Sequence, residues 1–114
     1  MAIFIVQGCY SQASIIGMIN KPEDRSIAVA KLAKAVGGKL LDYYVTFGEY
    51  DFTVIIEGGR GKSEADMMAA SMAAAASGGG TNLKTTVGIR SKDSMKAMRA
   101  AKKVLKGFSA AGSG

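Results

Sequence analysis

The sequence predicts an α+β fold of the split βαβ type, in which an antiparallel sheet carries its two main helices on one face. The first observation is the order of hydrophobic patterns, which runs strand, helix, strand, strand, helix, strand, with an extra helix. The second is a glycine-led polar turn at residues 47–52 between two runs rich in aromatic and β-branched residues, which indicates a β-hairpin. The third is size, because 114 residues with 48% hydrophobic and 21% charged side chains suit one globular domain.

Apolar alternation and capping residues define the first three elements. Residues 2–8 place apolar side chains on both faces, as in a strand that is covered on both sides. Ser11 is positioned to cap a short helical segment that ends near Asn20. Pro22 opens a helix over residues 22–36, because two acidic residues follow it and a glycine pair ends the pattern.

Two strands, Lys39–Phe47 and Phe52–Glu57, are predicted to form a hairpin and to be central strands of the sheet. Gly48 takes a positive φ at little steric cost, and the Asp51 carboxylate can accept hydrogen bonds from nearby amides, so both residues suit the turn. We expect this structural role ahead of a catalytic one. Alternation along the first strand puts on one face Leu41, Tyr43, Val45 and Phe47, and on the other Leu40, Asp42, Tyr44 and Thr46.

The second half of the chain adds a helix, a strand and a last helix. Ser63 and Asp66 form a variant of the capping box, so a helix is expected to run from there to Ser77, where three glycines end it. A fourth strand is expected over Thr81–Ile89, and Ser91 is expected to cap the last helix. That helix is amphipathic, with an apolar side of Met98, Ala101, Val104, Leu105 and Phe108 and a basic side of Lys96, Arg99, Lys103 and Lys106.

Charge divides the chain into two parts. Residues 1–89 hold eight basic and eight acidic residues, whereas residues 90–114 hold seven basic residues and one acid, so the net charge of +6 lies at the C-terminal end. We therefore predict a folded domain over residues 1–90 and a basic amphipathic helix and tail over residues 91–114. The basic side suits solvent, phosphate groups or an acidic partner, but it lacks stacking aromatics, so sequence-specific nucleic-acid binding is not predicted.

The residue types that are absent exclude several kinds of chemistry. The chain has no histidine, which rules out a His-dependent triad, a His-ligated haem and a facial-triad iron site. Its single cysteine, Cys9, has no partner for a disulfide or a metal site, so neither metal nor cofactor is predicted. No apolar stretch is long enough to cross a bilayer and the N-terminus lacks a secretory signal, so we expect a cytoplasmic protein with no membrane partner.

Both main helices on one side of the sheet leave its second face open. That face is also apolar, and the extra helix is too small to cover it. Because large exposed apolar patches usually mark interfaces, we expect two subunits to press these faces together as a two-fold homodimer.

Five short blocks occur in this chain in a defined order. The hairpin turn Gly48-Glu49-Tyr50-Asp51 has the pattern Gly-x-Tyr-Asp, and the other blocks are residues 22–25, 37–40, 43–47 and 84–86. In their order and spacing, residues 2 to about 90 resemble the GYD-domain family. The resemblance implies a ferredoxin-like fold and a dimeric α+β barrel, and it implies no reaction, because the family has no settled general activity.

Six polar residues are candidates for a ligand site: Arg25, Tyr43, Tyr44, Glu49, Tyr50 and Asp51. Tyrosine hydroxyls suit the few polar groups of a mostly apolar pocket, although core or interface packing is the commoner role of any one tyrosine. Arg25 opposes the helix dipole, which indicates either an anionic ligand or an ion pair to Glu49 or Asp51. We favour the ion pair.

These observations predict a homodimeric module that binds a small ligand or a partner, with the ligand left open. One alternative is a cofactor-free enzyme of the small monooxygenase or isomerase type. In such an enzyme five of these candidates, all except Tyr50, must converge on one cavity. The other alternative is a structural or cargo component that docks through its basic C-terminal helix.

Overall fold

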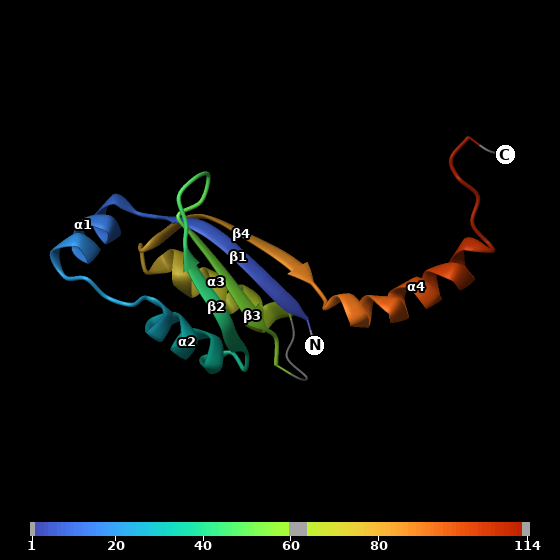
Figure 1. The fold of residues 1–114 in the computed structure, drawn as a ribbon, viewed down its shortest axis with the longest axis horizontal. Coiled ribbons are helices and arrows are strands. Elements are labelled where there is room, and N and C mark those ends of the chain that lie inside the picture. Colours follow the sequence, from blue (N-terminus) through green and yellow to red (C-terminus); the bar gives the residue numbers. More distant parts are fainter. Residues whose placement is uncertain (1, 60–63, 113–114) are drawn as a thin grey trace.

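The structure is a computed structural model that describes residues 2–59 and 64–112. Its elements follow the predicted order, with a short helix after the first strand and a last helix beyond the fourth (Figure 1). They are β1 (Ile3–Tyr10), α1 (Gln12–Asn20), α2 (Ser26–Ala35), β2 (Lys39–Val45), β3 (Phe52–Glu57), α3 (Glu64–Ala76), β4 (Gly80–Gly88) and α4 (Ser91–Leu105).

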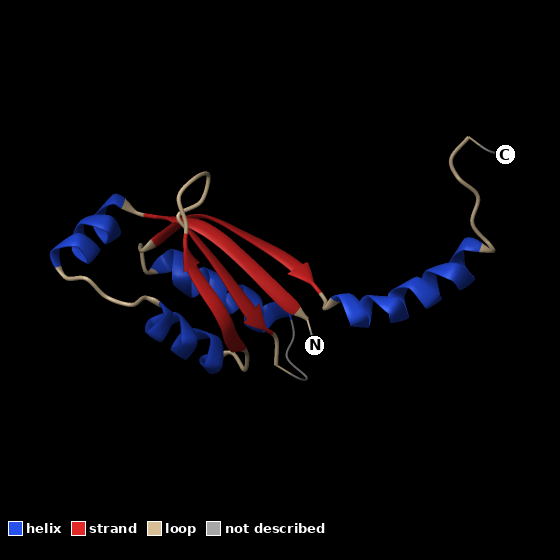
Figure 2. Ribbon diagram, in the orientation of Figure 1, coloured by secondary structure: helices blue, strands red, loops and turns tan. Residues whose placement is uncertain are grey.

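The four strands form one antiparallel sheet in the order β2-β3-β1-β4. β1 and β3 are the central strands, so the first strand of the chain pairs with both the third and the fourth. The prediction that both hairpin strands are central is therefore wrong for β2, which lies at the edge because β1 takes the other side of β3. The helices α2 and α3 lie on one face of the sheet, as Figure 2 shows. The predicted α+β fold, an antiparallel sheet with ferredoxin-like architecture, is confirmed.

The core lies between the sheet and these two helices, with β3 at its centre. Phe52, Val54 and Ile56 are buried and alternate with more exposed neighbours, as the predicted period of two requires. Ala33 of α2 packs against them. Gly8 of β1 lies opposite Phe52, where a Cβ would approach the Phe52 ring to 2.7 Å, so the close contact of ring and strand requires glycine.

A β-bulge in β2 changes one predicted pattern. The pairing of β2 with β3 shifts register between Leu40 and Asp42, which inserts one extra residue into β2. As a result Leu40 and Tyr43 both pack against the core. The prediction of strict alternation, which put these two side chains on opposite faces, is wrong. The extra residue shifts the alternation by one, so Leu40, before the bulge, lies on the same face as Tyr43, after it.

The helix α2 begins at Ser26 and not at Pro22. The Asp24 carboxylate accepts hydrogen bonds from the Ser26 hydroxyl at 2.7 Å and from the Ser26 amide at 3.0 Å, and these two bonds lower the pKa of Asp24. This local bonding competes with helix formation and delays the first turn. Arg25 therefore occupies the N-cap position, just before the helix.

The hairpin apex has the predicted turn. Gly48 has a φ of +151°, which favours glycine. The Asp51 carboxylate accepts a hydrogen bond from the backbone amide of Tyr10 at 2.9 Å, and the Asp51 amide donates to the Gly8 carbonyl at 2.8 Å. These bonds fasten the turn to β1, which gives Asp51 the structural role expected from its residue type.

The remaining helix ends differ in how they are capped. Ser11 caps α1 as predicted, since its hydroxyl accepts from the Ser14 amide at 3.1 Å. The capping box predicted at Ser63 lies outside the described residues. At α4 the predicted cap is wrong by one residue, because Arg90 holds the N-cap position and Ser91 is already helical. Arg90 also forms an ion pair with Glu57 at 2.7 Å, which fastens the start of α4 to β3.

Beyond this ion pair, α4 extends away from the sheet and buries none of its residues (Figure 1). Its apolar side is exposed along its length, at Met98, Val104, Leu105 and the following Phe108. Neither α4 nor any other helix in the described ranges has the length and apolar content needed to cross a membrane.

Candidate functional site

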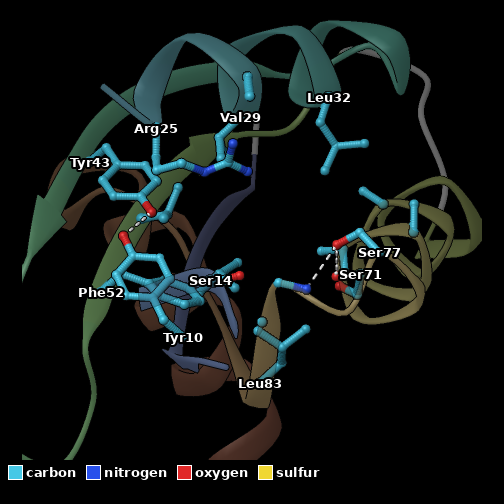
Figure 3. Close-up of a pocket in the computed structure, with 18 of the residues that line it drawn as sticks. Tyr10, Ser14, Arg25, Val29, Leu32, Tyr43, Phe52, Ser71, Ser77 and Leu83 are labelled. Carbon is cyan, nitrogen blue, oxygen red and sulfur yellow. Dashed lines mark hydrogen bonds between the residues drawn. The ribbon is translucent and has the colours of Figure 1, made fainter. Parts of the chain in front are cut away.

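A cavity of about 520 Å³ lies between the sheet and the helices α2 and α3 (Figure 3). Its volume falls within the range typical of small-molecule sites. The cavity exists because α3 lines it with alanines, Ala70, Ala73 and Ala74, whose side chains are too short to fill the space. Most of the remaining wall is apolar, including Val29, Leu32, Phe52, Val54, Ile56 and Leu83.

A pair of hydrogen-bonded tyrosines stands at one end of the cavity. Tyr10 ends β1 and Tyr43 comes from β2, and their hydroxyl oxygens are 2.5 Å apart. The Phe52 ring on the strand between them packs against both, with ring centroids 5.1 Å from Tyr10 and 6.2 Å from Tyr43. This packing fixes both phenol rings against the sheet.

The environment of this pair keeps Tyr43 neutral. Burial, followed by the hydrogen bond with Tyr10, raises the pKa of Tyr43 well above its ordinary value of 10.0. The two hydroxyl groups carry two protons, and the bond between them uses one. The other proton remains available as a hydrogen-bond donor to a ligand.

Arg25 supplies the positive charge of the cavity. Figure 3 shows its side chain extending from the start of α2 into the cavity beside Val29, near the tyrosine pair. Its guanidinium forms an ion pair with Glu23 at 3.5 Å, and the two side chains are 38% and 51% exposed. The favoured prediction of an ion pair to Glu49 or Asp51 is therefore wrong, because Glu23 lies two residues away and takes that place.

The other four predicted candidates lie elsewhere. Tyr44 follows Tyr43 in β2, points to the opposite side of the sheet and is 53% exposed. Glu49 and Tyr50 belong to the hairpin turn and do not line the cavity. Asp51 lines a separate groove of about 310 Å³ between α1 and the hairpin. The structure thus brings together Arg25 and Tyr43 alone among the six.

Sequence reasoning missed Tyr10, Ser14, Ser71 and Ser77, whose side chains also line the cavity. The position of Tyr10 was predictable from the sequence. Every second residue of a strand lies on the same face, so Tyr10 lies on the face of Phe4, Val6 and Gly8, toward the helices. Ending the predicted strand at Gly8 hid this relation. The serines carried no signal, because their role depends on where α1 and α3 lie relative to the sheet.

The cavity wall carries few groups suited to acid–base chemistry. Glu23 is the one carboxylate among the described residues that line the cavity, and its half-exposed side chain lacks the desolvation typical of a general base. Tyr43 is held in its neutral form. No group of three or more Cys, Asp or Glu side chains in residues 2–59 and 64–112 is placed to hold a metal ion.

Comparison with known proteins relates most of this chain to one family. The model of the GYD domain matches residues 4–98, which extend from the second residue of β1 into the first half of α4. No curated protein matches the chain. Among solved structures, the crystal structure of a hypothetical protein from Pyrococcus horikoshii is similar, with 15% identity and a TM-score of 0.48, over 79% of this chain and 92% of that chain.

Proposed function

The chain belongs to the GYD-domain family, and from this membership and the cavity beneath its sheet we propose that it is a homodimeric module that binds a small ligand. The observation that carries the proposal is the cavity of about 520 Å³, with a mostly apolar wall and a few polar groups, of which Arg25, Tyr10 and Tyr43 lie together. Sites of this size and composition are the usual form of small-molecule pockets.

The dispersal of the candidate residues supports a binding module ahead of a cofactor-free enzyme. A reaction that uses a carboxylate base requires that base to converge with the tyrosines on one cavity. Glu49 and Asp51 lie outside the cavity, and Asp51 is occupied by the backbone amide of Tyr10. The polar groups that do line the cavity, which are Arg25, its half-exposed partner Glu23, the tyrosine pair and three serine hydroxyls, suit recognition of a ligand.

The dimer is proposed from the second face of the sheet. Ile5 and Ile55 are paired across the central strands, and Ile3 lies two residues from Ile5 on the same face, away from α2 and α3. All three remain partly exposed in the single chain. An apolar centre of this kind is typical of homodimer interfaces, and pairing by a two-fold axis covers it on both subunits at once.

Filling the cavity tests the binding function. Native mass spectrometry of protein purified from its own host is expected to show a defined extra mass, and Ala74→Phe is expected to remove it, because Ala74 lines the cavity. Ala75→Phe is the matched control, since this neighbouring residue is exposed and does not line the cavity. Loss of the extra mass from both variants, or from neither, would contradict the proposal.

A second candidate function rests on α4. This helix carries the basic side predicted from the sequence, extends away from the domain and has no buried residue. The helix is thereby open to an acidic partner, with its apolar side available for contact. In this account residues 91–114 serve docking and the preceding domain serves dimer formation.

Truncation tests the docking function. Deleting residues 91–114 is expected to remove any larger assembly seen by native mass spectrometry and to leave the dimer intact. A full-length variant with glutamine at positions 96, 99, 103 and 106 keeps the apolar side, and it is expected to lose binding if charge drives association. An assembly that survives both changes would rule out docking through α4.

A further inference from the structure

The positive charge of the cavity and its pair of tyrosine hydroxyls lie together at one end. Arg25, Tyr10 and Tyr43 lie together beside the start of α2, whereas Val29, Leu32 and Leu83 line the space beyond them (Figure 3). Ser14, Ser71 and Ser77 add hydroxyls to the wall but no charge. A ligand that matches this distribution has one polar head and an apolar body.

The donors at the polar end outnumber the acceptors that they contact. The Arg25 guanidinium carries five N–H donors in a planar fork, and among the described residues its ion pair is with Glu23, at the long distance of 3.5 Å. The tyrosine pair has one hydroxyl proton left after the bond between Tyr10 and Tyr43. An acceptor group with two oxygens can use both sources of donors.

The sign of the charge separates the possible head groups. An ammonium head would lie beside Arg25 and find only the half-exposed Glu23 as a counter-ion. A hydroxyl head can accept a hydrogen bond from the guanidinium, but it brings no negative charge to pair with Arg25. A carboxylate can take a bidentate hydrogen bond from the guanidinium and a further one from the free tyrosine proton.

We propose that the cavity binds a small carboxylate with an apolar body, held by Arg25 and by the hydrogen-bonded pair of Tyr10 and Tyr43. This inference rests on the proposed binding function and names the class of its ligand. Glu23 competes with the ligand for the guanidinium, so its weak ion pair opens when the carboxylate enters. The apolar body then packs against Val29 and Leu32 of α2.

Three probes of equal length test the head group: octanoate, octan-1-ol and octylammonium. Binding is measured by titration calorimetry on the full-length protein, and octanoate is expected to bind at least about tenfold more tightly than either other probe. Arg25→Gln is expected to remove this preference. Lys31→Gln changes the charge of the same helix by the same amount at an exposed residue outside the cavity, and it is expected to leave the preference unchanged.

Two further variants separate this arrangement from its alternatives. Glu23→Gln is expected to tighten octanoate binding several-fold by removing the competing carboxylate, whereas a zwitterionic ligand that used Glu23 would require the opposite result. The double variant Tyr10→Phe and Tyr43→Phe is expected to weaken octanoate several-fold more than octan-1-ol, because either hydroxyl alone would still offer one free proton to the ligand. Between about pH 6 and pH 9 the affinity for octanoate is expected to stay constant, because the carboxylate is ionised and Tyr43 is neutral throughout.

The outcomes distinguish this inference from the function on which it rests. Equal binding of octanoate and octan-1-ol, with both lost in Ala74→Phe, would overturn the carboxylate and keep the binding module. A preference for octanoate that persists in Arg25→Gln would overturn the role of Arg25. If none of the three probes binds, the proposal of a small carboxylate with an apolar body is wrong. The proposed binding function is then still tested by whether the purified protein carries an extra mass.

Discussion

Replacing Phe52 with alanine is expected to lower the free energy of unfolding by about 3 to 5 kcal/mol, the cost typical of removing a buried aromatic ring. Phe52 is 8% exposed, packs against both Tyr10 and Tyr43, and lies over Gly8. Its loss would therefore remove the core contact of three strands at once. Urea denaturation followed by circular dichroism measures the change.

Phe52→Leu is the control for this prediction. Leucine keeps an apolar side chain over Gly8 and loses the ring contacts, so we expect a smaller cost, within about 1.5 kcal/mol. The tyrosine pair is expected to lose its fixed position in Phe52→Ala, so ligand affinity falls along with stability. A cost below about 1 kcal/mol for Phe52→Ala would show that the ring does not hold the core.

Replacing Ile5 with glutamate is expected to convert the proposed dimer into a monomer. Ile5 lies on the sheet face opposite the helices and is paired with Ile55, so a dimer through this face would bury two symmetry-related carboxylates without partners. Light scattering during size-exclusion chromatography measures the mass. The cavity lies on the other face, so the monomer is expected to keep its affinity for octanoate.

Ile5→Val is the matched control, because it keeps an apolar, β-branched side chain on the same face and is expected to remain dimeric. A dimer that persists in Ile5→Glu would move the interface to another surface. A wild-type protein that is monomeric at all concentrations would remove the dimer from the proposal.

Features of the fold that depend on residues close together in the chain were predictable from the sequence. The alternation of Phe52, Val54 and Ile56 with their neighbours, the turn at Gly48 and the helix ending before Ser77 all depend on residues close in the chain. Each is set by side-chain periodicity, by backbone freedom or by helix propensity. The split βαβ arrangement followed from the order of the elements, because few topologies accommodate it. The edge position of β2 did not, because its aromatic and β-branched residues are equally typical of a central strand.

Features that depend on contacts between elements were not predictable. The bulge that places Leu40 beside Tyr43 is a property of the pairing between β2 and β3. The late start of α2 depends on how Asp24 bonds to Ser26. The cavity depends on the distance at which an alanine-lined α3 lies from the sheet. The packing of the helices on the sheet also determines which of the candidate residues line the same cavity.

The four tyrosines of the chain permit the most direct test of the ligand cavity. Tyr10 and Tyr43 line it, whereas Tyr44 and Tyr50 do not. With ring-labelled tyrosine, assigned by single Tyr→Phe variants, titration with octanoate is expected to shift the NMR signals of Tyr10 and Tyr43 and to leave those of Tyr44 and Tyr50 in place. Shifts confined to Tyr44 and Tyr50, or spread equally over all four, would contradict binding between the sheet and α2 and α3.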